Sequence, residues 1–423
     1  MEKRTSDIID KIADYYRDEK YILLESQMPD HPSSEVSYIA IRPKSEIFGY
    51  GSVITKRSGD TEQAIDDNPW QAIRTYHDES EGTVFGYFGY ELKNYIESLE
   101  SKNISLLEVP DFYFMEPEIL IQVKGGEASL VRGEADLKRL QDHEPARPTG
   151  SISEIKLLER KSTYIRKVRK IQQKIREGDF YELNYSYPME ASITGNPFWL
   201  YQKSREINPV PFGAYIQAGD FQVCCASPER FLKKSGSKII SEPIKGTAPR
   251  SDDPATDQQY KEELLNEKNK AENLMIVDLV RHDLSMIAET GSVRVLKLFD
   301  IQTFGTVHQL ISSVEARTLD YVHPVDVIKA CFPMGSMTGA PKIEVMKTIE
   351  DLEIYRRGIY SGAIGYITPD GDFDFNVVIR SAMIKKGKLI YPVGGAITGD
   401  SDPEAEWEET HIKARTMSQI AKK

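Results

Sequence analysis

The sequence predicts an α+β fold built on large antiparallel β-sheets. Strand-like apolar runs and helical patterns are mixed along the chain, without the regular strand–helix alternation of a parallel, doubly wound sheet. The length of 423 residues indicates one large or two modest domains, and a hydrophobic content of 40% is enough for a substantial core. A polar connector with two prolines and a glycine, at 142–150, is the best candidate boundary. We expect an N-terminal region over 1–145 and a catalytic region over 155–423, interwoven in one compact unit.

Strands and one helix are predicted before the middle of the chain. Within the first 135 residues, strands are expected at 38–41, 83–90 and 119–123. Apolar residues recur at helical spacing over 165–175, and Gly178 ends that helix. Further strands are expected at 180–188, 210–216, 221–226 and 238–240.

The second half mixes the two kinds of element in the same way. A long helix is predicted over 266–289, in which Asp278 and Arg281 at i, i+3 should form a structural ion pair. A shorter helix is expected over 343–352 and a final one over 403–420. The intervening strands are expected at 293–299, 306–314, 363–367, 375–382 and 388–393.

Composition excludes several classes of function. The net charge is −12, and no basic cluster is long enough for nucleic-acid binding. The three cysteines, Cys224, Cys225 and Cys331, include no Cys-x-x-Cys pair, which argues against a disulfide framework or a zinc cage and fits a reducing compartment. Neither a signal peptide nor a run of transmembrane length is visible. We therefore expect a cytoplasmic protein with no nucleic-acid or membrane partner.

Lys245 is the most informative single residue. Apolar Ile239 and Ile240 run into a segment bounded by Pro and Gly, which predicts a strand end followed by a loop. A lysine held there, away from bulk water, can lose its proton and act as an amine nucleophile. That role requires a pKa lowered by burial or by a nearby cation. An ordinary solvated lysine is the alternative.

Acidic residues on two helices could hold a cation. Asp402 can cap the last helix, and Glu406, Glu409 and Lys413 then share one face at i, i+3 and i+7. Carboxylate oxygens suit Mg²⁺, and Glu272 could be another ligand. A solvated acidic helix start, stabilised by the helix dipole, is the alternative.

Two glycine-rich segments could bind an anion. The one at 393–400 precedes the last helix and can expose backbone N–H groups there. The one at 332–342 lacks the spacing of a P-loop, and we interpret it as a carboxylate-binding or shape-forming loop.

Eight strings in this chain, all in family order, resemble the chorismate-utilising enzymes, and within them the component I chains of aminodeoxychorismate synthase. They are SPERFL (227–232), PIKGT (243–247), AENLMIVDL (271–279), TVH (306–308), GSMTGAPK (335–342), RGIYSG (357–362), VIR (378–380) and DSDPEAEWEET (400–410). The first third of the chain matches only through LLES at 23–26. The resemblance implies two antiparallel sheets packed across one another with helices outside.

The resemblance also implies a role for each matching residue. Mg²⁺ would be held by Glu272 and Glu409, with Glu406 close by, and would bind the ring carboxylate of chorismate. Glu229 would be the general acid for the departing C4 hydroxyl. Chorismate itself would be contacted by Gly246, Thr247, His308, Thr338, Tyr360, Arg380, Gly394, Gly395, Ala396 and Lys413.

Lys245 decides the branch within the family. In the aminodeoxychorismate enzymes a lysine here is proposed to attack C2 and expel the C4 oxygen, after which ammonia displaces the lysine at C4. Anthranilate synthases usually carry alanine at this place. The chain departs from the pattern at Glu182, where this branch usually has glutamine and the isochorismate and salicylate synthases have a lysine. The other departures are His282, Met334 and Ala396.

The ammonia requires a second protein. None of the cysteines lies on the Gly-flanked turn of a glutaminase nucleophile, so the resemblance implies a glutamine amidotransferase subunit as partner. Anthranilate synthase component I, which aminates C2 and releases pyruvate, is the alternative function. A non-catalytic regulatory homologue is a further alternative, against which the retention of Glu229, Lys245, Glu272 and Glu409 speaks.

Overall fold

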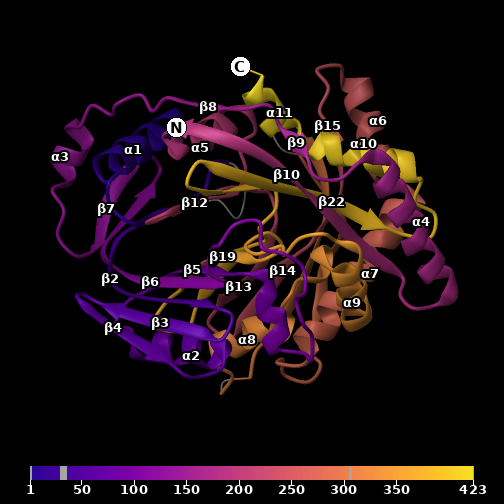
Figure 1. The fold of residues 1–423 in the computed structure, drawn as a ribbon, viewed down its shortest axis with the longest axis horizontal. Coiled ribbons are helices and arrows are strands. Elements are labelled where there is room, and N and C mark those ends of the chain that lie inside the picture. Colours follow the sequence, from indigo (N-terminus) through magenta and orange to yellow (C-terminus); the bar gives the residue numbers. More distant parts are fainter. Residues whose placement is uncertain (1, 29–35, 304–306, 320, 423) are drawn as a thin grey trace.

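Antiparallel strands form the framework of the protein (Figure 1). The computed structural model describes residues 2–28, 36–303, 307–319 and 321–422. The strand pairings within these residues are antiparallel, as the sequence predicts. Thr306, which belongs to one of the family strings, lies outside the described residues. No helix in the described ranges is long and apolar enough to cross a membrane.

The first sheet carries Glu182 and residues 394–396. Its order is β7 (Glu127–Arg132), β6 (Phe112–Lys124), β2 (Ser37–Tyr50), β1 (Tyr21–Glu25), β11 (Phe212–Ala218), β12 (Phe221–Ser227), β21 (Ser381–Lys385), β22 (Lys388–Ile397) and β10 (Glu182–Gly195). The other edge of β10 pairs with the short strands β8 (Gly150–Ile152), β9 (Lys156–Leu157) and β18 (Gly339–Ala340). β10 and β22 run side by side in Figure 1.

The second sheet carries Lys245. Its order is β4 (Thr61–Ile65), β3 (Val53–Ser58), β2, β6, β5 (Val84–Phe88), β19 (Ala363–Ile367), β20 (Phe373–Asn376), β13 (Arg230–Ser235), β14 (Lys238–Glu242), β17 (Val307–Arg317) and β16 (Arg294–Thr303). β15 (Ile244–Pro249) follows β14 along the same edge of β17.

Two long strands join the sheets. β2 pairs with β1 before residue 42 and with β3 after residue 44, and its pairing with β6 shifts register between Pro43 and Ser45. Strands of the N-terminal region therefore enter both sheets, since β1 pairs with β11 and β5 pairs with β19.

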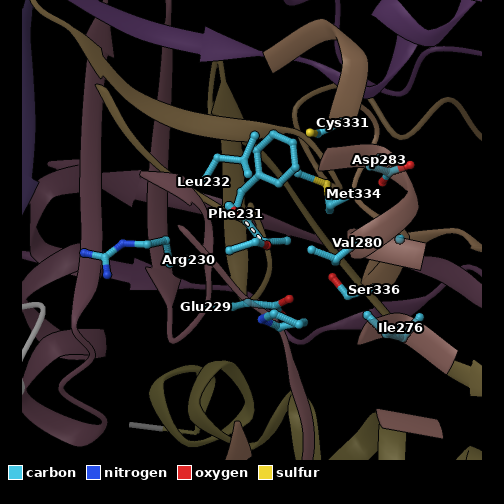
Figure 2. Close-up of a pocket in the computed structure, with 14 residues that line it drawn as sticks. Glu229, Arg230, Phe231, Leu232, Ile276, Val280, Asp283, Cys331, Met334 and Ser336 are labelled. Atoms are coloured by element: carbon cyan, nitrogen blue, oxygen red, sulfur yellow. Dashed lines mark hydrogen bonds between the residues drawn. The ribbon is translucent and has the colours of Figure 1, made fainter. Parts of the chain in front are cut away.

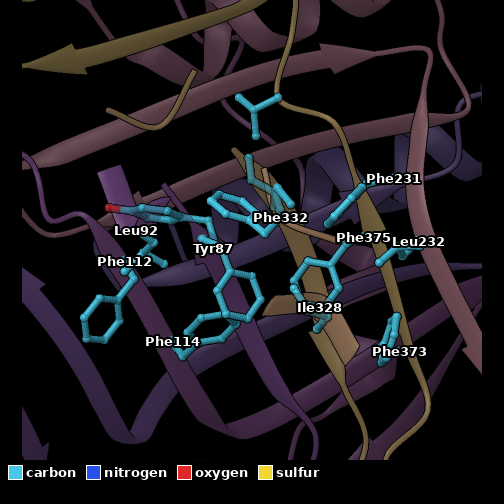
Figure 3. Packing of buried hydrophobic residues seen from close by; sticks show 14 of the residues in the cluster. Tyr87, Leu92, Phe112, Phe114, Phe231, Leu232, Ile328, Phe332, Phe373 and Phe375 are labelled. Carbon is cyan, nitrogen blue, oxygen red and sulfur yellow. The ribbon is translucent and has the colours of Figure 1, made fainter. Parts of the chain in front are cut away.

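Side-chain alternation along the strands creates two hydrophobic clusters. Ile22 of β1 belongs to one cluster, and its neighbours Tyr21 and Leu23 belong to the other. The first cluster collects side chains from both sheets and is rich in aromatic rings, as Figure 3 shows around Phe114, Phe332 and Phe375. The second contains side chains of the first sheet and of several helices. Two differently oriented apolar faces therefore hold the strands in place.

Helices cover the sheets. They are α1 (Glu2–Tyr15), α2 (Pro69–Glu79), α3 (Leu137–Asp142), α4 (Lys161–Glu177), α5 (Pro197–Ile207), α6 (Pro254–Leu264), α7 (Glu267–Ser285), α8 (Pro324–Cys331), α9 (Lys342–Leu352), α10 (Pro403–Lys413) and α11 (Arg415–Ala421), with 3₁₀ turns η1 (Tyr90–Tyr95) and η2 (Gly335–Met337). Proline at the first turn and an Asn or Asp cap begin several of them, for example α10 at Asp402. Gly178, at φ +89°, ends α4 as predicted.

Four predicted elements differ from those observed. The expected strand at 375–382 is divided into β20 and β21, because Arg380 between them has a φ of +51° that breaks the extended backbone. The expected last helix is divided at Ala414 into α10 and α11. The strand predicted to end at residue 393 continues through the glycines to Ile397. The expected loop around Lys245 is the strand β15.

Candidate active site

A bulge in β15 sets the position of Lys245. The pairing of β15 with β17 shifts register between Ile244 and Thr247, and Gly246 within the shift has a φ of +88°. An L-residue side chain is strained at this φ, so glycine is required for the backbone conformation. The bulge leaves Lys245 buried, with 8% of its surface exposed. The expectation that this lysine is withdrawn from water is therefore confirmed.

Lys245 is ion-paired with Glu182, at the start of β10. Its Nζ lies 2.5 Å from Oε1 of Glu182, whose side chain is almost completely buried. Burial acts to lower the pKa of Lys245, but the charges of Glu182 and Glu272 outweigh it, and the pKa lies above the usual lysine value. The predicted lowering of this pKa is therefore wrong for the protein without substrate. From the sequence, Glu182 is recognisable only as a departure from a family pattern. The expected pKa of Lys245 therefore does not include the effect of the Glu182 charge.

Glu229 has the properties of a general acid. It lies between β12 and β13 and is 5% exposed. Burial raises its pKa to about 7, against the opposing effects of the Ser336 hydroxyl and the Lys245 charge. Figure 2 shows the Glu229 and Ser336 side chains on one side of a pocket, with Ile276 nearby. The cavity there measures about 20 Å³, room for one water molecule.

Two carboxylates pair with Lys268, a residue that none of the predicted sites includes. Its Nζ lies 3.1 Å from Oε1 of Glu406 and 3.8 Å from Oε1 of Glu272. Glu409, on the same helix as Glu406, is paired instead with Lys413 at 2.8 Å, and that charge lowers its pKa. A sequence signal for Lys268 exists, since it precedes Glu272 by four residues on α7.

The carboxylate group fits a hard divalent cation. Within the described part of the chain, Oε1 of Glu272 is buried without a hydrogen-bond partner, and burial raises the pKa of this carboxyl. All the donors are oxygens, which is the set that Mg²⁺ prefers. Among the described residues the ligand atoms of Glu272, Glu406 and Glu409 do not all lie within 4.8 Å of one another. Binding of a cation would require these carboxylates to come closer together and Lys268, now 3.1 Å from Glu406, to move aside.

Arg380 and β22 offer a place for a carboxylate. Arg380 lies just before β21, and burial lowers the pKa of its guanidinium. Within the described residues it makes no ion pair with a carboxylate of the protein. The residues 394–396 pair with β10 on one edge, whereas β21 pairs with β22 only at 388–390. In the described part of the chain, no strand therefore pairs with the edge of residues 394–396 that faces away from β10.

Lys413 lies against the same part of β22. Nζ of Lys413 donates to the carbonyl oxygen of Gly394 at 3.0 Å, and a Cβ on Gly395 would lie 3.5 Å from that Nζ. Tyr360 is buried, and burial raises its pKa. Ala396, the departure from a glycine triplet, pairs with Asn184 in the regular ladder, so its methyl group does not disturb the strand.

Other predicted contacts are held in networks within the protein. His308 is fully buried, with Nε2 2.8 Å from Oδ1 of Asp257 and Nδ1 2.9 Å from Oγ1 of Thr303. The hydroxyl of Thr338 donates to the carbonyl oxygen of Met334 at 3.1 Å. Thr247 is exposed. The substrate contacts assigned to these three residues stay predictions.

One remaining expectation and one family string concern structure rather than substrate. Asp278 and Arg281 form the predicted ion pair at 2.8 Å, on the exposed side of α7. Arg357, the first residue of the RGIYSG string, has a structural role. It is buried, pairs with Glu353 at 2.6 Å and donates to the carbonyl oxygen of Asn184 on β10 at 2.8 Å. This arginine joins the turn before Tyr360 to the strand that carries Glu182.

Comparisons with known proteins agree with this arrangement. Residues 19–419 match the family of chorismate binding enzymes. The chain is 35% identical over 353 residues to anthranilate synthase component 1 of Thermus thermophilus, a match covering 79% of this chain and 76% of that one. It is 32% identical over 416 residues to aminodeoxychorismate synthase component 1 of Klebsiella aerogenes, covering 94% and 92%.

A solved structure of a related protein shares the fold. Anthranilate synthase component I from Streptococcus pneumoniae superposes with a TM-score of 0.81 at 27% identity, covering 92% of this chain and 93% of that one. The predicted antiparallel architecture with surrounding helices is confirmed. The chain belongs to the family of chorismate binding enzymes.

Proposed function

We propose that this chain aminates chorismate at C4, forming 4-amino-4-deoxychorismate, as component I of an aminodeoxychorismate synthase. The observation that carries the proposal is Lys245, a buried amine that is ion-paired with Glu182 and feels the charge of Glu229. Relatives of this name match nearly the whole chain. The lysine has no purpose in direct amination of C2, where the resemblance implies alanine.

The substrate is a dianion, and the site supplies cations for both carboxylates. Arg380 has no carboxylate partner in the described residues, and a guanidinium can bind a carboxylate through two parallel hydrogen bonds. The outer edge of 394–396 and Lys413 lie where β22 meets α10. Glu272, Glu406 and Glu409 would hold Mg²⁺, which when bound supplies a positive charge for the other carboxylate.

Glu229 and Lys245 would divide the chemistry at the ring. Hydroxide is a poor leaving group, so an acid must protonate the C4 oxygen as its bond to carbon breaks. A carboxyl with a pKa of about 7 retains its proton in much of the protein at neutral pH. The amine of Lys245 would form a bond to C2, and ammonia would then attack C4 and release the lysine.

Ammonia would come from a glutamine amidotransferase subunit. Relatives named component 1 imply a second component. Cys224, Cys225 and Cys331 are buried, and burial raises the pKa of each thiol, that of Cys225 to about 11. Such thiols are protonated at neutral pH and are poor nucleophiles, so none of them suits the hydrolysis of glutamine.

Anthranilate synthesis is the second candidate, because a relative of that name is 35% identical over 79% of this chain. The two activities differ in product. The purified chain is incubated with chorismate, Mg²⁺ and ammonium, and the products are separated and identified by mass. We expect 4-amino-4-deoxychorismate, with its enolpyruvyl group retained. Anthranilate together with free pyruvate would favour the second candidate, and no product from well-bound chorismate would favour a non-catalytic protein.

A further inference from the structure

The pair formed by Lys245 and Glu182 is fixed by the backbone on both sides. Glu182 begins β10, where it pairs with Ala340, and the close approach of Gly339 leaves no room for a Cβ near the Glu182 carbonyl. Lys245 is held by the bulge at Gly246. Oε1 of Glu182 accepts the hydrogen bond from Nζ, and Oε2 is buried with no hydrogen-bond partner among the residues that the structure describes. A carboxylate with one free, buried oxygen has capacity for a proton.

The paired lysine cannot react as it stands. Nζ carries a proton that must leave before its lone pair can form a bond to carbon. Glu229, Glu272 and Glu409 also act on Lys245 through their charges, from the β12–β13 connection, α7 and α10. Among the described residues, however, Glu182 is the acceptor that Nζ reaches with a hydrogen bond. Glu229 must keep a proton for the leaving oxygen, and Glu272 and Glu409 face the cation site.

We propose that Glu182 is the positioning residue of Lys245 and takes up its proton when the amine attacks the ring, returning it when the lysine is released. The proposal rests on the function proposed above. It assigns a role to Glu182, a charged residue at a position where the resemblance implies a neutral glutamine. An amide cannot accept this proton, so a glutamine here would leave the lysine to lose its proton to solvent.

The proton balance closes over one turnover. A proton passes from Nζ to Glu182, the Nζ–C2 bond forms, the ring double bonds shift, and the C4–O bond breaks as Glu229 gives its proton to form water. The nitrogen joined to C2 is then a secondary ammonium. Ammonia next attacks C4, the double bonds shift back and the C2–Nζ bond breaks. Glu229 takes the surplus proton of the new amine, and Glu182 returns its proton to Lys245.

This route has a signature in the pH dependence of the first half-reaction. When the proton moves within the pair, the resting and reactive forms contain the same number of protons, so the rate does not depend on proton loss to solvent. With glutamine at 182, the reactive amine forms only by that loss, and the rate rises about tenfold per pH unit up to about pH 7, above which Glu229 begins to lose the proton that the C4 oxygen needs. General-base contributions are typically 10²- to 10⁴-fold.

The test follows formation of the Lys245 adduct with chorismate and Mg²⁺ in the absence of ammonia. Samples of the wild-type chain, Glu182→Gln and Glu190→Gln are quenched at intervals between pH 5.5 and 8.5, and the peptide bearing residue 245 is quantified by mass spectrometry. Glu190 lies on the same strand, pairs with Lys388 at 3.0 Å and is the matched control. Circular dichroism and chorismate binding check that each variant is folded.

We expect a flat profile between pH 5.5 and 6.5 for the wild-type chain and for Glu190→Gln. Glu182→Gln should be slower by at least about 10²-fold at pH 6 and should recover with rising pH. A flat profile and a near wild-type rate in Glu182→Gln would overturn the proposal. A tenfold rise per pH unit in the wild-type chain itself would also overturn it, whether or not the variant folds.

Failure of the proposed function has a different outcome. In that case the wild-type chain forms no adduct at Lys245, and its product with ammonium is not aminated at C4. If the adduct and the C4-aminated product both form, the proposed function stands and the two profiles decide the role of Glu182 alone.

Discussion

Replacing Glu229 by glutamine should stabilise the protein at alkaline pH while removing its activity. The carboxyl is 5% exposed, and burial raises its pKa from 4.5 to about 7. The folded protein therefore holds this proton more tightly than the unfolded chain does. The stabilisation is fully present below the unfolded pKa of 4.5 and is lost as the pH rises through about 7. At about 1.4 kcal/mol for each pKa unit, the loss amounts to about 3 kcal/mol.

Glutamine resembles the protonated acid in shape and cannot ionise. The free energy of unfolding of Glu229→Gln should equal that of the wild-type chain most closely near pH 5 and exceed it by about 3 kcal/mol near pH 8.5. Urea-induced unfolding, followed by circular dichroism at both pH values, measures the difference, with Glu190→Gln as the control substitution at a half-buried strand position. The rate of C4 amination should fall by about 10²- to 10⁴-fold.

The refuting result is a stability difference that stays constant from pH 5 to pH 8.5. Glu229 would then ionise at its ordinary pKa despite its burial, and its assignment as the proton donor would lose its physical basis. A variant that keeps wild-type activity would contradict the assignment directly.

Two further predictions concern the cation and the source of nitrogen. Glu272→Gln and Glu409→Gln should each abolish Mg²⁺-dependent turnover. Lys268→Met should bind Mg²⁺ more tightly by calorimetry, because the substitution removes an ammonium that lies 3.1 Å from Glu406. Full turnover in EDTA or near-normal rates in both glutamine variants would contradict the cation assignment. The isolated chain should use ammonium but not glutamine, because its thiols are buried with raised pKa values; efficient glutamine use by the homogeneous chain would show that this is wrong.

Much of the fold could be predicted from local signals. The helix ending at Gly178 and the long helix α7 have clear spacing and end signals, and the structure places both near the predicted bounds. The division of the 375–382 strand depends on the left-handed backbone of Arg380, which no local propensity favours in an arginine. Tertiary contacts hold that residue there, so sequence periodicity could not indicate it.

The site was predictable in its residue types but not in its charge balance. The sequence around residue 245 indicates Lys245 and the resemblance indicates Glu229, and the structure places both in buried positions. The pKa direction of Lys245 depends on Glu182, which is 63 residues away in sequence and meets it only because β10 and β15 approach each other. Lys268 is similar, since its contact with Glu406 joins two helices distant in sequence. Ion pairs between distant elements are the part that sequence patterns leave open.

Mass spectrometry of the Lys245 peptide tests the central claim most directly. The wild-type chain and Lys245→Ala are each incubated with chorismate and Mg²⁺ without ammonia, digested and compared, and the product is then identified after ammonium is added. The account predicts a covalent adduct on the wild-type peptide, a fall of at least about 10²-fold in C4 amination for Lys245→Ala, and chorismate binding that survives through Arg380. A Lys245→Ala variant that retains the wild-type rate and product would contradict the account.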